Sequence, residues 1–123
     1  MKIALLQLNV SDDPAANLSN TLEMLDAAVA QGAEFVLTPE VTNCISTSRR
    51  HQNDVLALEQ DDKSLVALRK AAAHHGITLL IGSLGLKTTD EDGRFANRSF
   101  LIDGQGDIVA RYDKIHMFDV QVT

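Results

Sequence analysis

The stretch AVAQGAEFVLTPE, residues 28–40, holds the end of one helical pattern and the whole of one strand pattern. Gly32 is typical of the position just past a helix C-terminus. Glu34–Thr38 is then continuous rather than alternating, as in a strand covered on both faces. The strand ends on Pro39 and Glu40. Because a carboxylate without partners is costly to desolvate, Glu40 either reaches water or lies where a negative charge or a proton acceptor is useful.

A helix and an earlier strand are expected before this stretch. Lys2–Val10 is a short apolar run of strand length. Asp12–Pro14 combines an N-cap aspartate with a proline at the first helical position. Apolar side chains then recur at steps of four, three and four, as on one face of a helix: Leu18, Leu22, Leu25 and Val29. The order strand, helix, strand predicts parallel neighbours in a sheet.

A second helix is expected after a polar stretch, Thr42–Asn53, in which residues 42–50 are interpreted as a loop of the kind that shapes an active-site mouth. Asp61 and Asp62 lie at the helix start and Gly76 ends it. Its inner face consists of three apolar residues: Leu65, Leu68 and Ala72. The histidine pair 74–75 falls in the last turn, where a positive charge favours the helix dipole. Adjacent helical residues point about 100° apart, so we do not predict a metal site there.

The last third of the chain is predicted to be all strand. Ile77–Leu86 is a third apolar strand, and Phe95–Asp103 and Ile108–Tyr112 form a hairpin about the turn 104–107. The glycines of that turn lack the third glycine and the helix of a dinucleotide fingerprint. The sequence therefore predicts an α/β domain whose sheet is parallel at first and antiparallel at its end.

Composition limits the classes of function. With 123 residues, 45% hydrophobic and 23% charged, the chain is typical of one globular domain. A net charge of −6 argues against nucleic acid or an anionic membrane as the main partner. No apolar run approaches the roughly 20 residues of a membrane span, and the N-terminus is interpreted as a strand, not a signal peptide. The single cysteine, Cys44, excludes an intrachain disulfide, which favours a cytoplasmic location.

Two charged residues follow strands and are the main candidates for catalysis. Glu40 follows the second strand, and Lys114 follows the last one. Functional groups in open α/β sheets gather beyond the carboxyl ends of strands, so these two side chains could meet there. A carboxylate could take a proton from a nucleophile while an ammonium stabilises an oxyanion. The alternative is a structural ion pair, with the ammonium offsetting the burial of the carboxylate.

Other candidates have two interpretations each. Cys44 is expected to be a small buried or loop thiol, because a nearby carboxylate raises a thiol pKa. Asp113 and Asp119 would hold the lysine ammonium or cap a turn, and His116 would pack beside the lysine. Two more pairs would either shape the site or face solvent: Asn97 with Arg98, and Arg49 with Arg50, where an arginine could bind a substrate carboxylate.

Several segments together resemble the nitrilase, or carbon–nitrogen hydrolase, superfamily. Along the chain they are IALLQLNV (3–10), AVAQGAEFVLTPE (28–40), LTPEVTN (37–43), GITLLIGSLGL (76–86) and RYDKIHMFD (111–119), and their order and spacing resemble those of the family. The stretch FANRSFLIDGQGDIVARYDKIHMFD (95–119) extends the likeness to the whole chain. KIHMFDV (114–120) is most similar to the branch of omega-amidase and deaminated glutathione amidase.

The resemblance implies a Glu–Lys–Cys triad in which Glu40 is the general base and Lys114 stabilises the oxyanion. In the family, the nucleophilic cysteine and a second, assisting glutamate both come after the lysine, beyond Thr123. The substrate would be a small amide, with no metal or organic cofactor, and the family suggests a homo-oligomer. Residues 1–123 would be the N-terminal portion of one four-layer α-β-β-α sandwich, a mixed sheet with helices on one face.

These implications leave expectations for the polypeptide itself. Without the cysteine it would be inactive alone, and strands such as Leu79–Ile81 would expose one face to a partner or to self-association. One alternative is a catalytically silent fragment or pseudoenzyme that acts as a binding module. A nucleotide-binding α/β domain is a second alternative, against which the absence of a phosphate loop argues. The choice of amide or nitrile as substrate is not determined by any residue of the sequence.

Overall fold

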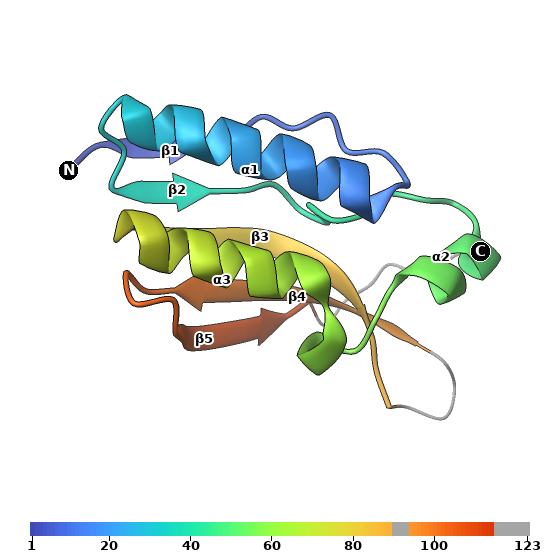
Figure 1. Cartoon of the computed structure of the whole chain (residues 1–123). Coiled ribbons are helices and arrows are strands. Elements are labelled where there is room, and N and C mark those ends of the chain that lie inside the picture. The colour runs from blue at the N-terminus through green and yellow to red at the C-terminus, as the bar shows by residue number, and fades with distance from the viewer. Residues whose placement is uncertain (90–93, 115–123) are drawn as a thin grey trace.

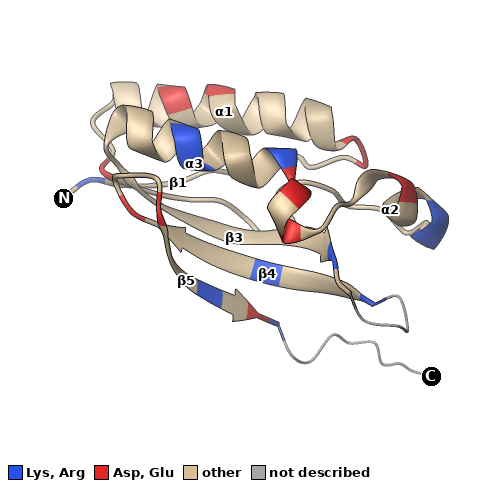
Figure 2. Ribbon diagram, turned by 60° about the horizontal axis from the view of Figure 1, so that its bottom comes forward, with Lys and Arg blue, Asp and Glu red and all other residues tan. Residues whose placement is uncertain are grey.

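The computed structural model describes residues 1–89 and 94–114, which form one five-stranded mixed sheet with two long helices on one face (Figure 1, Figure 2). The strands lie in chain order: β1 (Ile3–Leu5), β2 (Phe35–Leu37), β3 (Thr78–Lys87), β4 (Phe95–Ile102) and β5 (Ile108–Asp113). The first three are parallel, and β4 and β5 are antiparallel to their neighbours. The predicted fold class is therefore confirmed.

Both predicted helices are present with the predicted ends. Helix α1 (Pro14–Ala30) begins at Asp13, whose carboxylate accepts hydrogen bonds from two backbone N–H groups of the first turn. Helix α3 (Lys63–His75) follows a short 3₁₀ helix, η1 (Glu59–Asp61), and is capped in the same way by Asp62. Gly32 and Gly76 follow the two helices with φ of 97° and 64°, a left-handed conformation that favours glycine.

The prediction of a loop over residues 42–50 is wrong at its end, where helix α2 (Arg49–Val55) begins. The Ser48 hydroxyl caps this helix by accepting a hydrogen bond from the His51 N–H. No residue of α2 is buried. The helix therefore has no apolar stripe from which the sequence could predict it. The predicted first strand, Lys2–Val10, is also too long, because only Ile3–Leu5 pairs as β1.

The hydrophobic core lies between the helices and the sheet. Leu25 of α1 and Leu68 of α3 are fully buried against Val36, Ile81 and Phe100 of the sheet. None of the helices in the described ranges is both long and apolar enough to cross a membrane.

Among residues 1–89 and 94–114, no helix lies on the opposite face of the sheet (Figure 2). The strand register places four leucines in one row across it: Leu5, Leu37, Leu80 and Leu101. Leu5 is 78% exposed, and Phe35 and Leu37 are only half-buried. The expectation that the strand over 34–38 is covered on both faces therefore does not hold among the described residues. We call this surface the open face.

Candidate active site

The segment after β2, residues 38–43, stays against β3 and brings Glu40 to its place. The Thr38 N–H donates to the Leu80 carbonyl (3.0 Å), and the Ser83 N–H donates to the Pro39 carbonyl (3.2 Å). Further along, the Thr42 N–H donates to the Ser83 carbonyl (2.9 Å). These bonds continue the sheet beyond the end of β2, so the backbone on both sides of Glu40 is fixed to a central strand.

Gly82 allows this segment to lie directly against β3. A Cβ at that position would lie 2.0 Å from the Thr38 carbonyl oxygen and 2.9 Å from the Pro39 carbonyl. The pairing of β3 with β4 also shifts register between Ile81 and Leu84, where the strand passes the segment. A residue with any side chain at position 82 would push the segment away from the strand.

The residue after Glu40 has an unusual backbone conformation. Val41 has a φ of 45°, a left-handed conformation that costs a β-branched residue about 1–3 kcal/mol. The Ser83 hydroxyl accepts a hydrogen bond from the Val41 N–H (2.7 Å), and Ser83 is buried. Asn43 then fixes the end of the segment, because its side chain bonds both the N–H and the carbonyl of Gly85 (2.8 and 2.9 Å). Strain at this turn is held by specific bonds, as is common at functional sites.

Glu40 and Lys114 form an ion pair although they are 74 positions apart. The Lys114 Nζ atom lies 2.9 Å from Glu40 Oε2. Asn97 of β4 donates from Nδ2 to the same oxygen (3.0 Å), and the Lys114 N–H donates to the Asn97 carbonyl (2.9 Å). Within residues 1–89 and 94–114, Glu40 Oε1 makes no hydrogen bond. One carboxylate oxygen is therefore held by two donors, while the other can accept a proton.

The ion pair lowers the pKa of Glu40 below its usual 4.5. The hydrogen bond from Lys114 is the main cause, the bond from Asn97 adds to it, and partial burial opposes both. The side chains of Glu40 and Lys114 are 54% and 41% exposed. The expectation that Lys114 offsets the burial of Glu40 is thus not met among the described residues, where the pair is open to solvent.

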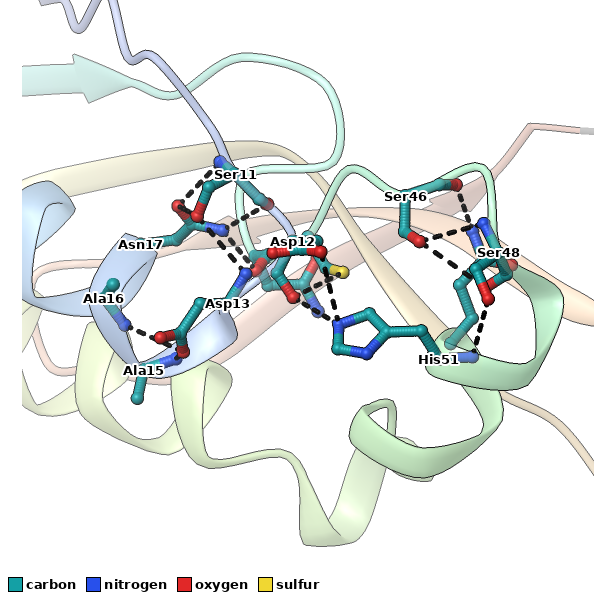
Figure 3. Close-up of polar contacts among 12 residues, drawn as sticks. Ser11, Asp12, Asp13, Ala15, Ala16, Asn17, Ser46, Ser48 and His51 are labelled. Atoms are coloured by element: carbon teal, nitrogen blue, oxygen red, sulfur yellow. Dashed lines mark hydrogen bonds and ion pairs between the residues drawn. The ribbon is translucent and has the colours of Figure 1, made fainter.

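Cys44 lies in a different environment, near the start of α1. It is buried, and its Sγ atom is 3.6 Å from the Asp12 carbonyl oxygen. His51 of α2 approaches the same carbonyl, with Nε2 at 2.6 Å (Figure 3). Burial raises the pKa of the thiol, and the carboxylates of Asp12 and Asp13 raise it further. Cys44 therefore has the protonated, packed state expected for a structural thiol.

The remaining candidates are only partly brought to the pair. Arg49 stacks over the ring of Phe95, with its guanidinium carbon 5.3 Å from the ring centroid, and Arg50 is exposed on α2. Asp113 neither holds the ammonium nor caps a turn, because its carboxylate binds Arg98 of β4. His116 and Asp119 lie outside the described residues.

His75, the last residue of α3, has a partner on helix α1. His75 Nε2 lies 2.9 Å from Asp26 Oδ1 of α1, and the two rings of the pair 74–75 contact each other edge to face. Across residues 1–89 and 94–114, no three His, Cys, Asp or Glu side chains gather as metal ligands would.

Comparison with known proteins places this geometry in a family. Residues 2–123 match the family model described as "Carbon-nitrogen hydrolase". The chain belongs to this family. Deaminated glutathione amidase of Yersinia enterocolitica is 31% identical over 121 residues, 98% of this chain and 41% of that protein. The chloroplastic omega-amidase of Arabidopsis thaliana is 30% identical over 125 residues, 98% of this chain and 32% of that protein. The predicted amidase branch of the nitrilase superfamily is thus confirmed.

A solved carbon–nitrogen hydrolase has the same fold. The amidase from Nesterenkonia sp. superposes with a TM-score of 0.77 and 27% identity, over 98% of this chain and 44% of that one. Other structures of that amidase are of variants: one in which a glutamate is replaced by glutamine shows the Michael addition of acrylamide at the active-site cysteine, and one in which a cysteine is replaced by alanine holds butyramide. The chain spans less than half the length of each of these relatives.

Sequence reasoning found the ion pair but missed the residues that fix it. Gly82 and Ser83 interrupt an otherwise apolar strand run, and a glycine inside a strand often marks a close approach of another backbone. This signal was available in GITLLIGSLGL, residues 76–86. Asn97 was among the candidates, but its contact with Glu40 joins β4 to the segment after β2, and no local pattern shows such a contact.

Proposed function

We propose that this protein hydrolyses the C–N bond of small carboxamides through a cysteine nucleophile, with Glu40 as general base and Lys114 as the stabiliser of the oxyanion. The observation that carries the proposal is the 2.9 Å contact between Lys114 Nζ and Glu40 Oε2, which leaves Oε1 without a hydrogen bond among the described residues. The family pattern supplies the cysteine after the lysine, beyond position 123. Cys44 is not a candidate, because its pKa is raised.

Each step assigns one task to one group. Glu40 Oε1 accepts the thiol proton while the sulfur attacks the amide carbon, and the ammonium of Lys114 stabilises the negative oxygen that forms. The carbon–nitrogen bond then breaks, and Glu40 returns the proton to the leaving nitrogen, which departs as ammonia or an amine. Glu40 next takes a proton from water, whose oxygen attacks the thioester; the carbon–sulfur bond breaks, the carboxylic acid is released, and Glu40 returns the proton to the sulfur.

The printed names of the relatives support small amides as the substrate class. Two of the relatives are amidases by name, and a cysteine-to-alanine variant of the structurally similar amidase forms a complex with butyramide. We therefore expect the full-length protein that carries this sequence to accept short aliphatic amides. The carboxylate-bearing amides of the omega-amidase branch are the next substrates to test.

The first prediction is that Glu40→Gln removes turnover in the full-length protein. Loss of a general base lowers the rate by about 10²–10⁴-fold. Ammonia release from butyramide measures this, and Lys114→Gln should lower kcat similarly by removing oxyanion stabilisation. The matched control is Glu23→Gln on α1, a glutamate remote from the pair. Full activity of Glu40→Gln would contradict the proposal.

A binding module without catalysis is the second candidate. It is favoured by the solvent exposure of the ion pair, which is typical of a structural salt bridge. Butyramide that binds to the full-length wild-type protein without ammonia release, and binds equally to Glu40→Gln, would support this candidate.

A further inference from the structure

A second charge cluster lies at the end of the β4–β5 hairpin that carries Lys114. Arg98 and Asp113 face each other in register across the two strands. The guanidinium of Arg98 binds the carboxylate with both arms: Nε donates to Oδ1, and Nη2 donates to Oδ2 at 3.0 Å. This bidentate geometry fixes both distance and orientation, unlike a single-point ion pair.

The Arg98–Asp113 pair is adjacent in sequence to the two groups that hold Glu40. Asn97 precedes Arg98, and Lys114 follows Asp113. Successive side chains of a strand point to opposite faces of the sheet. The Arg98–Asp113 pair therefore lies on one face and the Asn97 amide on the other. The pair therefore fixes the backbone of the residues beside it, including the bond from the Lys114 N–H to the Asn97 carbonyl.

Glu59 of η1 connects this pair to the helical layer. Its Oε1 accepts from Arg98 Nη1 (3.0 Å), and its Oε2 accepts from Arg111 Nη2 (2.7 Å). The side chains of Arg98 and Glu59 are only 24% and 22% exposed, so this inner part of the network is better protected from water than a usual surface pair, whereas Asp113 and Arg111 are 50% and 51% exposed. The pKa values of Glu59 and Asp113 are both lowered by their arginine partners.

Apart from its backbone pairing with β4, strand β5 has few side-chain contacts to hold its end among the described residues. It lies at the edge of the sheet, and every side chain from Val109 to Asp113 is exposed. Packing therefore does not fix the register at the point where the strand delivers Lys114. The ion network supplies the fixed contact that packing does not.

We propose that Arg98 and Asp113, anchored by Glu59, are positioning residues that set the Lys114 ammonium and the Asn97 amide at Glu40 Oε2. The proposal rests on the proposed function for its catalytic meaning, but the geometric claim stands apart from it. The alternative to this positioning role is that Arg98 and Asp113 form a salt bridge that contributes to stability alone.

The second prediction distinguishes the positioning role from the purely stabilising salt bridge by the direction in which the pKa of Glu40 changes. In Asp113→Asn of the full-length protein, the midpoint of the Glu40 carboxyl is followed by carbon NMR without substrate. Loss of a nearby negative charge alone lowers the pKa of Glu40, whereas displacement of Lys114 raises it. We expect a rise. Arg98→Lys keeps the charge but loses the bidentate fork, and it should shift the pKa in the same direction.

The matched control lies at the other end of the same hairpin. Asp107 and Arg69 form a looser Asp–Arg contact at 4.0 Å away from Lys114, so Asp107→Asn should leave the Glu40 midpoint unchanged. A fall or no change of the midpoint in both Asp113→Asn and Arg98→Lys would overturn the proposal, whether or not the protein has amidase activity.

Activity gives the catalytic readout. Displacing a catalytic group by about 1 Å costs roughly a hundredfold in rate, so kcat for butyramide should fall about tenfold to a hundredfold in Asp113→Asn with KM little changed. Equal kcat in Asp113→Asn and Asp107→Asn, in a protein that otherwise hydrolyses butyramide, would overturn the positioning role. No turnover even in the wild type would instead count against the proposed function, and the titration would still decide the geometric claim.

Discussion

The two oxygens of the Glu40 carboxylate have different surroundings, and this difference decides which of them can act as a base. Oε2 accepts from Lys114 and Asn97, both of which lower the pKa of the group below 4.5. A lowered pKa means that the ion pair stabilises the folded chain above about pH 4.5, and that this contribution is lost as the pH falls through the lowered pKa. The carboxylate is thus ionised across the neutral range.

The third prediction concerns Asn97, the second donor to Glu40 Oε2. Asn97→Ala removes one donor to Oε2, so the pKa of Glu40 should rise and the acid limb of the kcat/KM profile should move to higher pH. Because the carboxylate stays ionised at neutral pH, the fall in kcat/KM that we expect there, about tenfold or roughly 1.4 kcal/mol, comes from the less fixed position of Glu40 after loss of the Asn97 bond. Asn20→Ala, on the exposed side of α1, is the control. An unchanged acid limb would show that Asn97 does not tune the base.

At the scale of elements, the contact between segment 38–43 and β3 places Glu40. The fourth prediction is that Gly82→Ala destabilises the protein by about 3 kcal/mol, the upper end of usual overpacking, because the added Cβ meets backbone at 2.0 Å. Gly85→Ala on the same strand is the control, since its Cβ would make an ordinary contact of 3.5 Å with Leu56. Urea unfolding of both variants measures the difference. Equal stability of the two would mean that the segment moves away at little cost.

The helices and strands also show how much of the fold the sequence alone predicts. The caps and glycines of α1 and α3 are local signals, and both helices begin and end as predicted. Helix α2 has a serine cap but no apolar stripe, so its pattern does not differ from that of a loop. The meeting of Glu40 and Lys114 follows from a general rule about strand ends. The contact at Gly82 and the bond from Asn97 are tertiary, and they depend on register that no single segment specifies.

At the scale of the whole molecule, the open face is an apolar surface that has no partner among the described residues. Its row of leucines crosses all of the first four strands, and monomers rarely expose so continuous a patch. We propose that residues 1–123 are the N-terminal portion of one domain, and that the rest of that domain covers this face as the second sheet of the sandwich. Leu5 tests this, because it is 78% exposed among the described residues.

The fifth prediction is that Leu5→Lys destabilises the full-length protein by about 2 kcal/mol or more, because a fully buried leucine contributes about 1.5–3 kcal/mol and a buried ammonium is costly. If the open face meets solvent instead, the same change is close to neutral. Val66→Lys is the matched control, since Val66 is 45% exposed on the helix α3. Urea unfolding of the two full-length variants, compared with the polypeptide 1–123 alone, separates the outcomes. A covered face makes Leu5→Lys costly only when the rest of the protein is present, and equal stability of the two full-length variants would show that no second layer packs on the sheet.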